Sequence, residues 1–356
     1  MTKAGKTATL PETALPVALD GPDLVTALRI FGASGEFPLL ARQGTFTLGS
    51  SPSCDVAIDS PYLSALQLVL ERRDGRIRVH DQASKNGTVF KGRAERTFDL
   101  GAGDVFTTAG ISFLALSEDM RTARATFAEL LGLDDDKLSD ETLREAASER
   151  PLLVIAEAGS DEARLSRALH DASLRRGGPF VPLGSAPASL AEGKSAVGRA
   201  RRGTLVVPVA GTAVDAAFVG MLLSADFQVR AIAEARTLEA AVKSLGLEAV
   251  SRFHQVVVRP LRERASDIPI LLERSFLAER ASLRFIELTE KNQAALRRCP
   301  WPENLIELRE AGRRIAGLAQ HGSIRQASAK LGIPRTTFQY WVDGLDLEVP
   351  VTRVRT

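Results

Sequence analysis

The stretch Thr204-Leu205-Val206-Val207-Pro208-Val209 decides the fold of the central part of the chain, because such an apolar run is typical of a strand buried on both faces. Two similar runs occur at residues 152–155 and 229–233, and residues 162–174 between them have helical periodicity. Parallel strands require long crossover connections, which are usually helices. The alternation over residues 150–262 therefore predicts an α/β subdomain with a parallel sheet.

Residues 25–117, on the N-terminal side, alternate between short apolar runs and turn residues. Residues 45–48 are one such run, and Asn86-Gly87 is a strong turn sequence for a hairpin. This spacing predicts an all-β sandwich. Residues 1–24 mix Thr, Ala, Pro and Gly without periodicity, which predicts a flexible tail.

Helical periodicity is found on both sides of the central subdomain. Residues 118–149 form a predicted helical linker, and residues 263–320 form a predicted helical lid subdomain. Residues 321–347 hold two short predicted helices, and residues 348–356 follow as a tail. The expected fold class is multi-domain, with an all-β part, an α/β part and an α part in that order.

The composition excludes several classes of protein. Of the 356 residues, 44% are apolar and 25% are charged, and no run of about eighteen apolar residues could form a membrane span. The two cysteines, Cys54 and Cys299, are far apart and lack metal-ligand spacing, so neither a disulfide framework nor a zinc site is expected. We expect a cytoplasmic protein with no cofactor and no metal.

The two short helices near the C-terminus carry the clearest functional pattern. Ser323 can cap the first helix, and Gly332 can adopt the positive φ that a turn between helices requires. Phe338 and Val342, four residues apart, should both face inward on the second helix. Other side chains are suited to base edges and phosphates, namely Lys330, Arg335, Thr336, Thr337, Gln339 and Tyr340.

Charge supports this interpretation, because residues 298–341 contain seven basic and three acidic residues. The words of residues 327–338, A-S-A-K-L-G-I-P-R-T-T-F, resemble the Fis-type helix-turn-helix. The resemblance implies binding to double-stranded DNA and, since such units usually act in pairs, a homodimer or larger oligomer. The alternative is an ordinary helical hairpin with a glycine turn.

Two motifs beyond residue 259 resemble the AAA+ domain of sigma-54-dependent activators. Residues 260–269 resemble its P-L-R-E-R-x-x-D-I-P signature, and residues 301–308 resemble its W-P-G-N-x-R-E-L segment. The catalytic positions differ from the family. Glu162 stands where the phosphate-loop lysine belongs and would repel a triphosphate, and Pro208 and Val209 replace the Walker B acids.

Other family features are also missing. Arg236 stands at the sensor asparagine and Ile306 at the sensor arginine. Together these losses predict that the chain neither hydrolyses ATP nor binds nucleotide. The G-A-F-T-G-A loop, which touches the sigma factor in that family, is absent, so remodelling of sigma-54 polymerase is not expected. Residues 193–198 in that region are expected to be a solvated loop.

The segment from Phe46 to Leu116 resembles a forkhead-associated domain through four sequence words, L-G-S at 48–50, C-D-V-A-I at 54–58, L-S at 63–64 and D-Q-A-S-K-N-G-T at 81–88. In that family an arginine, a serine and an asparagine bind phosphothreonine. Here Ser50 occupies the arginine position and Gln67 replaces a loop-bracing histidine, while Ser64 and Asn86 are retained and Lys85 offers a point charge. The resemblance implies a protein partner, bound through phosphothreonine or without it.

Three hypotheses follow. The favoured one is a DNA-binding transcription regulator with a signalling or docking β domain and a pseudo-ATPase core. The second is a working ATP-dependent sigma-54 activator, against which Glu162, Pro208 and Val209 argue. The third is a protein-interaction scaffold that does not read DNA.

Overall fold

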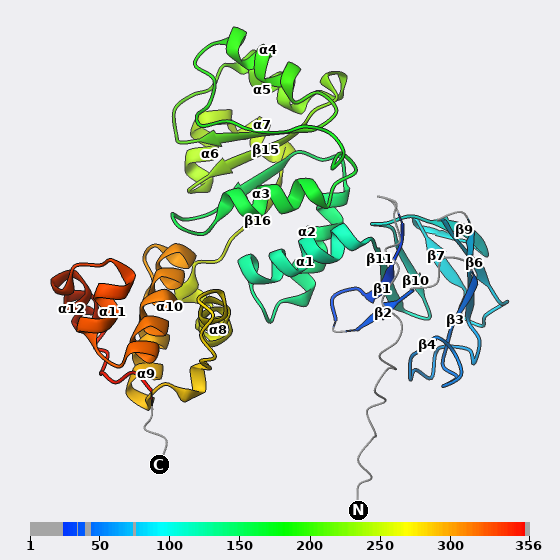
Figure 1. Ribbon diagram of the computed structural model, residues 1–356. Helices are drawn as coiled ribbons and strands as arrows, with labels where there is room; N and C mark the ends of the chain where they lie inside the picture. Colours follow the sequence, from blue (N-terminus) through cyan, green and yellow to red (C-terminus); the bar gives the residue numbers. More distant parts are fainter. Residues whose placement is uncertain (1–23, 34, 40–43, 74–75, 353–356) are drawn as a thin grey trace, which may run out of the picture. The chain divides into compact units, whose positions relative to one another are not determined.

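The structure is a computed structural model that describes residues 24–33, 35–39, 44–73 and 76–352 (Figure 1). The predicted N-terminal tail therefore lies outside the described residues except for Leu24, and so do residues 353–356 of the predicted C-terminal tail. The chain divides into two compact units, residues 1–121 and 122–356. No helix in the described part of the chain is long and apolar enough to cross a bilayer.

The first unit contains the strands β1 (Ala27–Ile30), β2 (Glu36–Pro38), β3 (Gly44–Gly49), β4 (Val56–Ala57), β5 (Leu68–Arg73), β6 (Arg76–Asp81), β7 (Thr88–Phe90), β8 (Arg93–Ala94), β9 (Thr97–Leu100), β10 (Val105–Thr108) and β11 (Ile111–Leu116). One sheet has the order β2-β1-β11-β10-β7-β8 and the other has the order β4-β3-β5-β6-β9. The pairs are antiparallel apart from β3 with β4. The predicted β-sandwich is confirmed.

The core of the sandwich follows from the alternation along its strands. In β9 and β10 every second residue is buried, which is the pattern of strands with one face on a core. The rings of Phe98 and Phe90 stack at 4.3 Å, and those of Phe106 and Phe113 stack at 5.2 Å. These aromatic pairs fill the space between the inner faces.

Helix α1 (Glu118–Leu131) includes the boundary between the two units, and α2 (Asp136–Ala147) follows in the second unit. The α/β elements that follow are β12 (Leu152–Ile155), α3 (Glu162–Asp171), β13 (Phe180–Pro182), α4 (Leu190–Arg199), β14 (Thr204–Val209), α5 (Ala216–Leu223), η1 (Ala225–Phe227), β15 (Arg230–Ala235), α6 (Leu238–Leu245), α7 (Leu247–Arg252) and β16 (His254–Val257). The five strands form a parallel sheet of order β13-β14-β15-β12-β16. The predicted α/β subdomain is confirmed.

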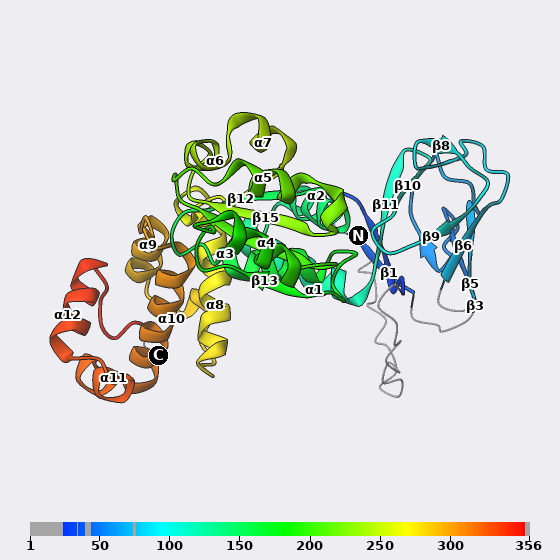
Figure 2. The same cartoon turned by 90° about the horizontal axis from the view of Figure 1, so that it is seen from above.

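A helical region follows, with η2 (Leu261–Glu263), η3 (Ala265–Asp267), α8 (Ile268–Ala278), η4 (Phe285–Glu287), α9 (Glu290–Arg298), α10 (Asn304–His321), α11 (Ile324–Leu331) and α12 (Arg335–Gly344). Helices α8, α9 and α10 lie together, and α11 and α12 follow from the end of α10 (Figure 2). Residues 348–352 of the predicted tail return to α9, where Asn292 donates a hydrogen bond to the Glu348 carbonyl at 3.0 Å.

One prediction is wrong: residues 193–198 are part of the helix α4 and not a solvated loop. Ser189 caps this helix, since its hydroxyl accepts a hydrogen bond from the Glu192 N–H at 3.3 Å. Ala196 and Val197 are buried in the core beside the sheet. Burial of this face outweighs the low helix propensity of its glycines.

Candidate functional site

The carboxyl ends of β12, β14 and β15 lie at one edge of the parallel sheet, where open α/β proteins bind ligands. The loop of residues 156–161 leads from β12 to α3. Its Gly159 has a φ of +74°, and a Cβ there would lie 2.0 Å from the Glu303 carbonyl oxygen. Asn304 Nδ2 donates to the Ala158 carbonyl at 3.0 Å, and Ile306 N–H donates to that of Gly159 at 3.2 Å. The start of α10 therefore packs directly against the loop.

Two ion pairs lie at this edge of the sheet. Glu162 contacts Arg236 at 2.7 Å, so the residue expected at the phosphate-loop lysine pairs with the residue expected at the sensor asparagine. Arg262 binds the Glu157 carboxylate through two hydrogen bonds of 2.6 Å, which lower the pKa of Glu157. In β14, Val209 is buried and adds no polar group.

Glu234 is a charged residue at this edge that sequence reasoning missed. It lies on β15 directly opposite Pro208, and Ser166 Oγ donates to its carboxylate at 2.6 Å. Burial raises the pKa of Glu234. In the sequence, Glu234 could have been found as the single acidic residue in the largely apolar stretch of residues 229–235. Among the described residues, no group of three or more His, Cys, Asp or Glu is placed to hold a metal ion.

The loops of the β-sandwich bring the predicted partner-binding residues together. The Ser50 N–H donates to the Ser64 carbonyl at 3.0 Å, and the Ser50 hydroxyl donates to the Leu63 carbonyl at 3.1 Å. Asn86 Nδ2 donates to the Tyr62 carbonyl at 2.8 Å. Lys85 is exposed beside Asn86. The serine at the arginine position is thus used to hold the loop that carries Ser64.

Two residues support these loops from inside. Gln67 is fully buried, where its Oε1 accepts from the Ser64 N–H at 2.9 Å and its Nε2 donates to Thr108 Oγ1 at 2.8 Å. Gln67 therefore braces the loop that carries Ser64. Asp81 accepts hydrogen bonds from Ser84 and Thr88. Burial alone would raise the pKa of Asp81, but these bonds outweigh it and lower the pKa.

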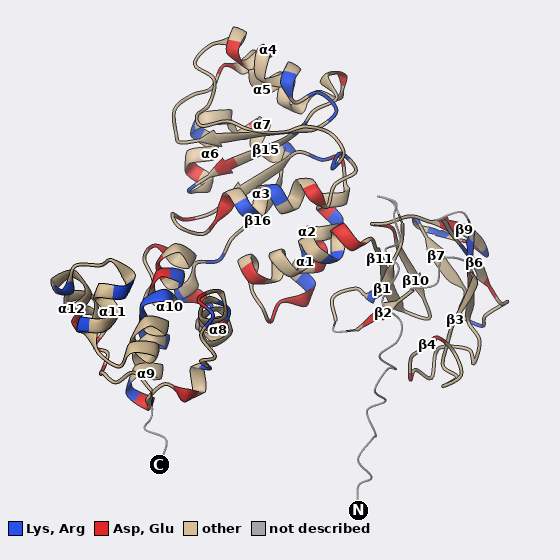
Figure 3. Ribbon diagram, in the orientation of Figure 1, with Lys and Arg blue, Asp and Glu red and all other residues tan. Residues whose placement is uncertain are grey.

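Helices α11 and α12 have the predicted inward and outward faces. Phe338 and Val342 are buried, and the Phe338 ring meets Trp341 edge-on at 5.8 Å. Gly332, with a φ of +68°, ends α11 in the left-handed conformation. The predicted DNA-binding side chains are all exposed: Lys330, Arg335, Thr336, Thr337, Gln339 and Tyr340. Lysine and arginine also lie along α10, α11 and α12 (Figure 3).

The β-sandwich is similar to a known family of domains. Residues 46–108 match the FHA domain family. The FHA domain of CT664 from Chlamydia trachomatis is similar at 26% identity, covering 26% of this chain and 95% of that chain, with a TM-score of 0.24. NtrX from Brucella abortus in complex with ADP is similar at 17% identity, covering 64% of this chain and 72% of that chain, with a TM-score of 0.42. A comparison with curated proteins finds no match.

Proposed function

We propose that this protein is a DNA-binding transcription regulator. Helices α11 and α12 contact DNA, the FHA domain docks a protein partner, and the α/β subdomain is a frame that does not hydrolyse ATP. The observation that carries the proposal is the division of α12 into two faces. Phe338 and Val342 anchor one face, and the other presents Arg335, Thr337 and Gln339 to solvent.

The chemistry of the exposed face suits nucleic acid. A guanidinium binds guanine edges or phosphate with paired hydrogen bonds, and threonine and glutamine also reach base edges. Arg335 is the first residue of α12 and is exposed, so it can approach a groove with the N-terminal turn of the helix. The Gln339 amide contacts Asp343 at 2.8 Å, and this contact would have to open for Gln339 to read a base.

The test is binding of genomic DNA fragments by the full chain and by Arg335→Ala. We expect Arg335→Ala to lose about 1–3 kcal/mol of binding free energy at selected sites, with a shallower dependence on salt. Arg201→Ala removes another exposed arginine, beyond α4, and is the matched control. If Arg335→Ala bound DNA as tightly as the wild type, or if the wild type did not bind DNA at low salt, the regulator proposal would be wrong. Either result would support the protein-interaction scaffold that does not read DNA.

We propose that the chain does not hydrolyse ATP because of the residues at the carboxyl edge of the parallel sheet. The Glu162–Arg236 ion pair sets a carboxylate where a triphosphate requires a cation, and the loop glycine that remains, Gly159, packs against the Glu303 carbonyl. We expect no ATP turnover by the purified chain, with or without DNA. Turnover that disappears in a Glu162→Ala variant would instead support the ATP-dependent activator.

The FHA domain is proposed to take the protein partner, which would be a phosphothreonine peptide or an unphosphorylated segment. Ser64 and Asn86 lie on neighbouring loops, and exposed Lys85 adds a positive charge. The test is a phosphothreonine peptide library against its unphosphorylated copy, with the wild-type chain and Lys85→Ala. Selective binding that Lys85→Ala weakens supports phosphate recognition, whereas equal binding of both libraries supports docking without phosphate.

A further inference from the structure

Two uncharged residues, Thr336 and Tyr340, lie at the centre of the exposed face of α12. Successive residues of an α-helix are about 100° apart around its axis, so these two lie on one side of α12 and the buried Phe338 lies on the opposite side. Both are exposed, and Tyr340 is 82% exposed. Arg335 lies nearer the edge of this face, because its angular position is close to that of the buried Val342. Thr336 and Tyr340 therefore point away from the helical core most directly.

The two side chains are neighbours along the helix. Side chains of an α-helix lean toward its N-terminus, so the Tyr340 ring extends toward the first turn, where Thr336 lies. Within the described part of the chain Tyr340 has no hydrogen-bond, ion-pair or ring partner. The next residue differs, because the Trp341 ring meets Phe338 at 5.8 Å and the Arg314 guanidinium at 5.1 Å. The Tyr340 ring and the Thr336 methyl group thus form one apolar patch that is open to a ligand.

The charges on α12 determine which end of the helix can approach DNA. Asp343, one turn after Gln339, is exposed and accepts a hydrogen bond from the Gln339 amide at 2.8 Å. Its negative charge repels phosphates, whereas Arg335 on the first turn attracts them. In the proposed DNA complex the first two turns of α12 would therefore enter the groove, with the patch of Thr336 and Tyr340 foremost.

We propose that the patch of Thr336 and Tyr340 selects thymine by its 5-methyl group. This inference rests on the proposed DNA binding and names the base that the site reads. Thymine is the only one of the four DNA bases with a methyl group on its major-groove edge, and apolar side-chain atoms recognise that group by contact. The patch offers a methyl group and an aromatic ring without charge. Guanine, which arginine or lysine reads through paired hydrogen bonds, fits it less well.

The test replaces thymine by uracil in the DNA, which removes the methyl group and keeps every hydrogen-bonding atom of the base. Duplexes that the full chain binds are selected from a random pool, and their affinities are then measured by fluorescence anisotropy at constant salt. We expect uracil at one or two thymine positions of the selected sequence to weaken wild-type binding about fourfold, the factor expected for one methyl group that loses an apolar contact. Uracil at thymines outside the selected sequence should have no effect.

Variants of the two residues connect the effect to the patch. Tyr340→Gln removes the ring and should abolish the difference between thymine and uracil duplexes, and Thr336→Ser removes only the methyl group and should reduce it. Tyr340→Phe keeps the ring and should retain the difference. Arg335→Ala should weaken the binding of both duplexes by the same factor, because it removes a charge and no methyl contact. The substituted residues are exposed, and circular dichroism checks that each variant is folded.

The outcomes separate this inference from the proposed function. If the wild type bound thymine and uracil duplexes equally at every position, or if the difference persisted in Tyr340→Gln, thymine selection by the patch would be wrong although DNA binding held. Selected duplexes that share no thymine would overturn it as well. If the wild type bound no DNA at low salt, the proposed function would fail and thymine selection with it.

Discussion

Asn304 joins three segments of the second unit, and its replacement has a cost that the structure allows us to work out. Its Oδ1 accepts from the buried Leu261 N–H at 2.9 Å, and its Nδ2 donates to the Ala158 carbonyl at 3.0 Å. Its φ of +45° also favours asparagine or glycine over alanine. Leaving a buried donor unpaired costs about 1–3 kcal/mol, while the Ala158 carbonyl can regain water because Ala158 is exposed.

We therefore expect Asn304→Gly to lose about 1–3 kcal/mol of unfolding free energy, and Asn304→Ala to lose about 1 kcal/mol more because of the left-handed backbone. The assay is urea unfolding followed by the fluorescence of Trp301, which is buried three residues away. A Trp341→Phe background leaves Trp301 as the single tryptophan of the chain. A loss below about 1 kcal/mol for the glycine variant, or equal stability of the two variants, would refute this reasoning.

Two further predictions concern the α/β subdomain. Burial raises the pKa of Glu234 above its usual 4.5, so the folded state loses stability as the pH rises from 4.5 through the raised pKa. Glu234→Gln should therefore raise the melting temperature at pH 7 and have little effect at pH 4. Gly193→Ala should cost about 1–3 kcal/mol, because its Cβ would lie 2.5 Å from the Phe218 ring. Gly198→Ala on the same helix meets open space and should be neutral or stabilising, as thermal unfolding will show. Equal losses at the two glycines would contradict this account.

Features that depend on neighbouring residues could be predicted from the sequence. The run of residues 204–209 is β14 with the same bounds. The inward placement of Phe338 and Val342 followed from their spacing on one helix. The exposed residues of α12 could be predicted for the same reason.

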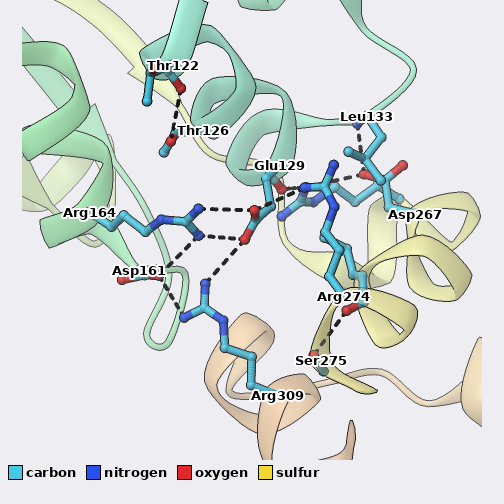
Figure 4. A network of polar contacts seen from close by, with 12 residues as sticks. Thr122, Thr126, Glu129, Leu133, Asp161, Arg164, Asp267, Arg274, Ser275 and Arg309 are labelled. Atoms are coloured by element: carbon cyan, nitrogen blue, oxygen red, sulfur yellow. Dashed lines mark hydrogen bonds and ion pairs between the residues drawn. The ribbon is translucent and has the colours of Figure 1, made fainter. Parts of the chain in front are cut away.

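Features that depend on contacts between residues far apart in the chain could not be predicted from the sequence. Helix α4 was missed because two glycines in ten residues weaken a helical pattern, although the Phe218 ring leaves no room for a side chain at Gly193. The acid at position 162 was visible in the sequence, but the ion pair between Glu162 and Arg236 was not, because the two residues are far apart in the chain. The ion-pair cluster around Glu129 (Figure 4) draws on four helices and has no local pattern at all.

These contacts bear on how a signal could reach the proposed DNA-binding helices. Asn304 and the Glu157–Arg262 ion pair connect the α/β subdomain to the helical region. Helix α11 packs against α10, where Leu331 lies close to Gly317. In the proposed frame these contacts persist, so we expect regulation to act through a partner of the FHA domain. Because Glu129 is the acid on α1 that Arg164, Arg274 and Arg309 share, a change there would reach both halves of the frame at once.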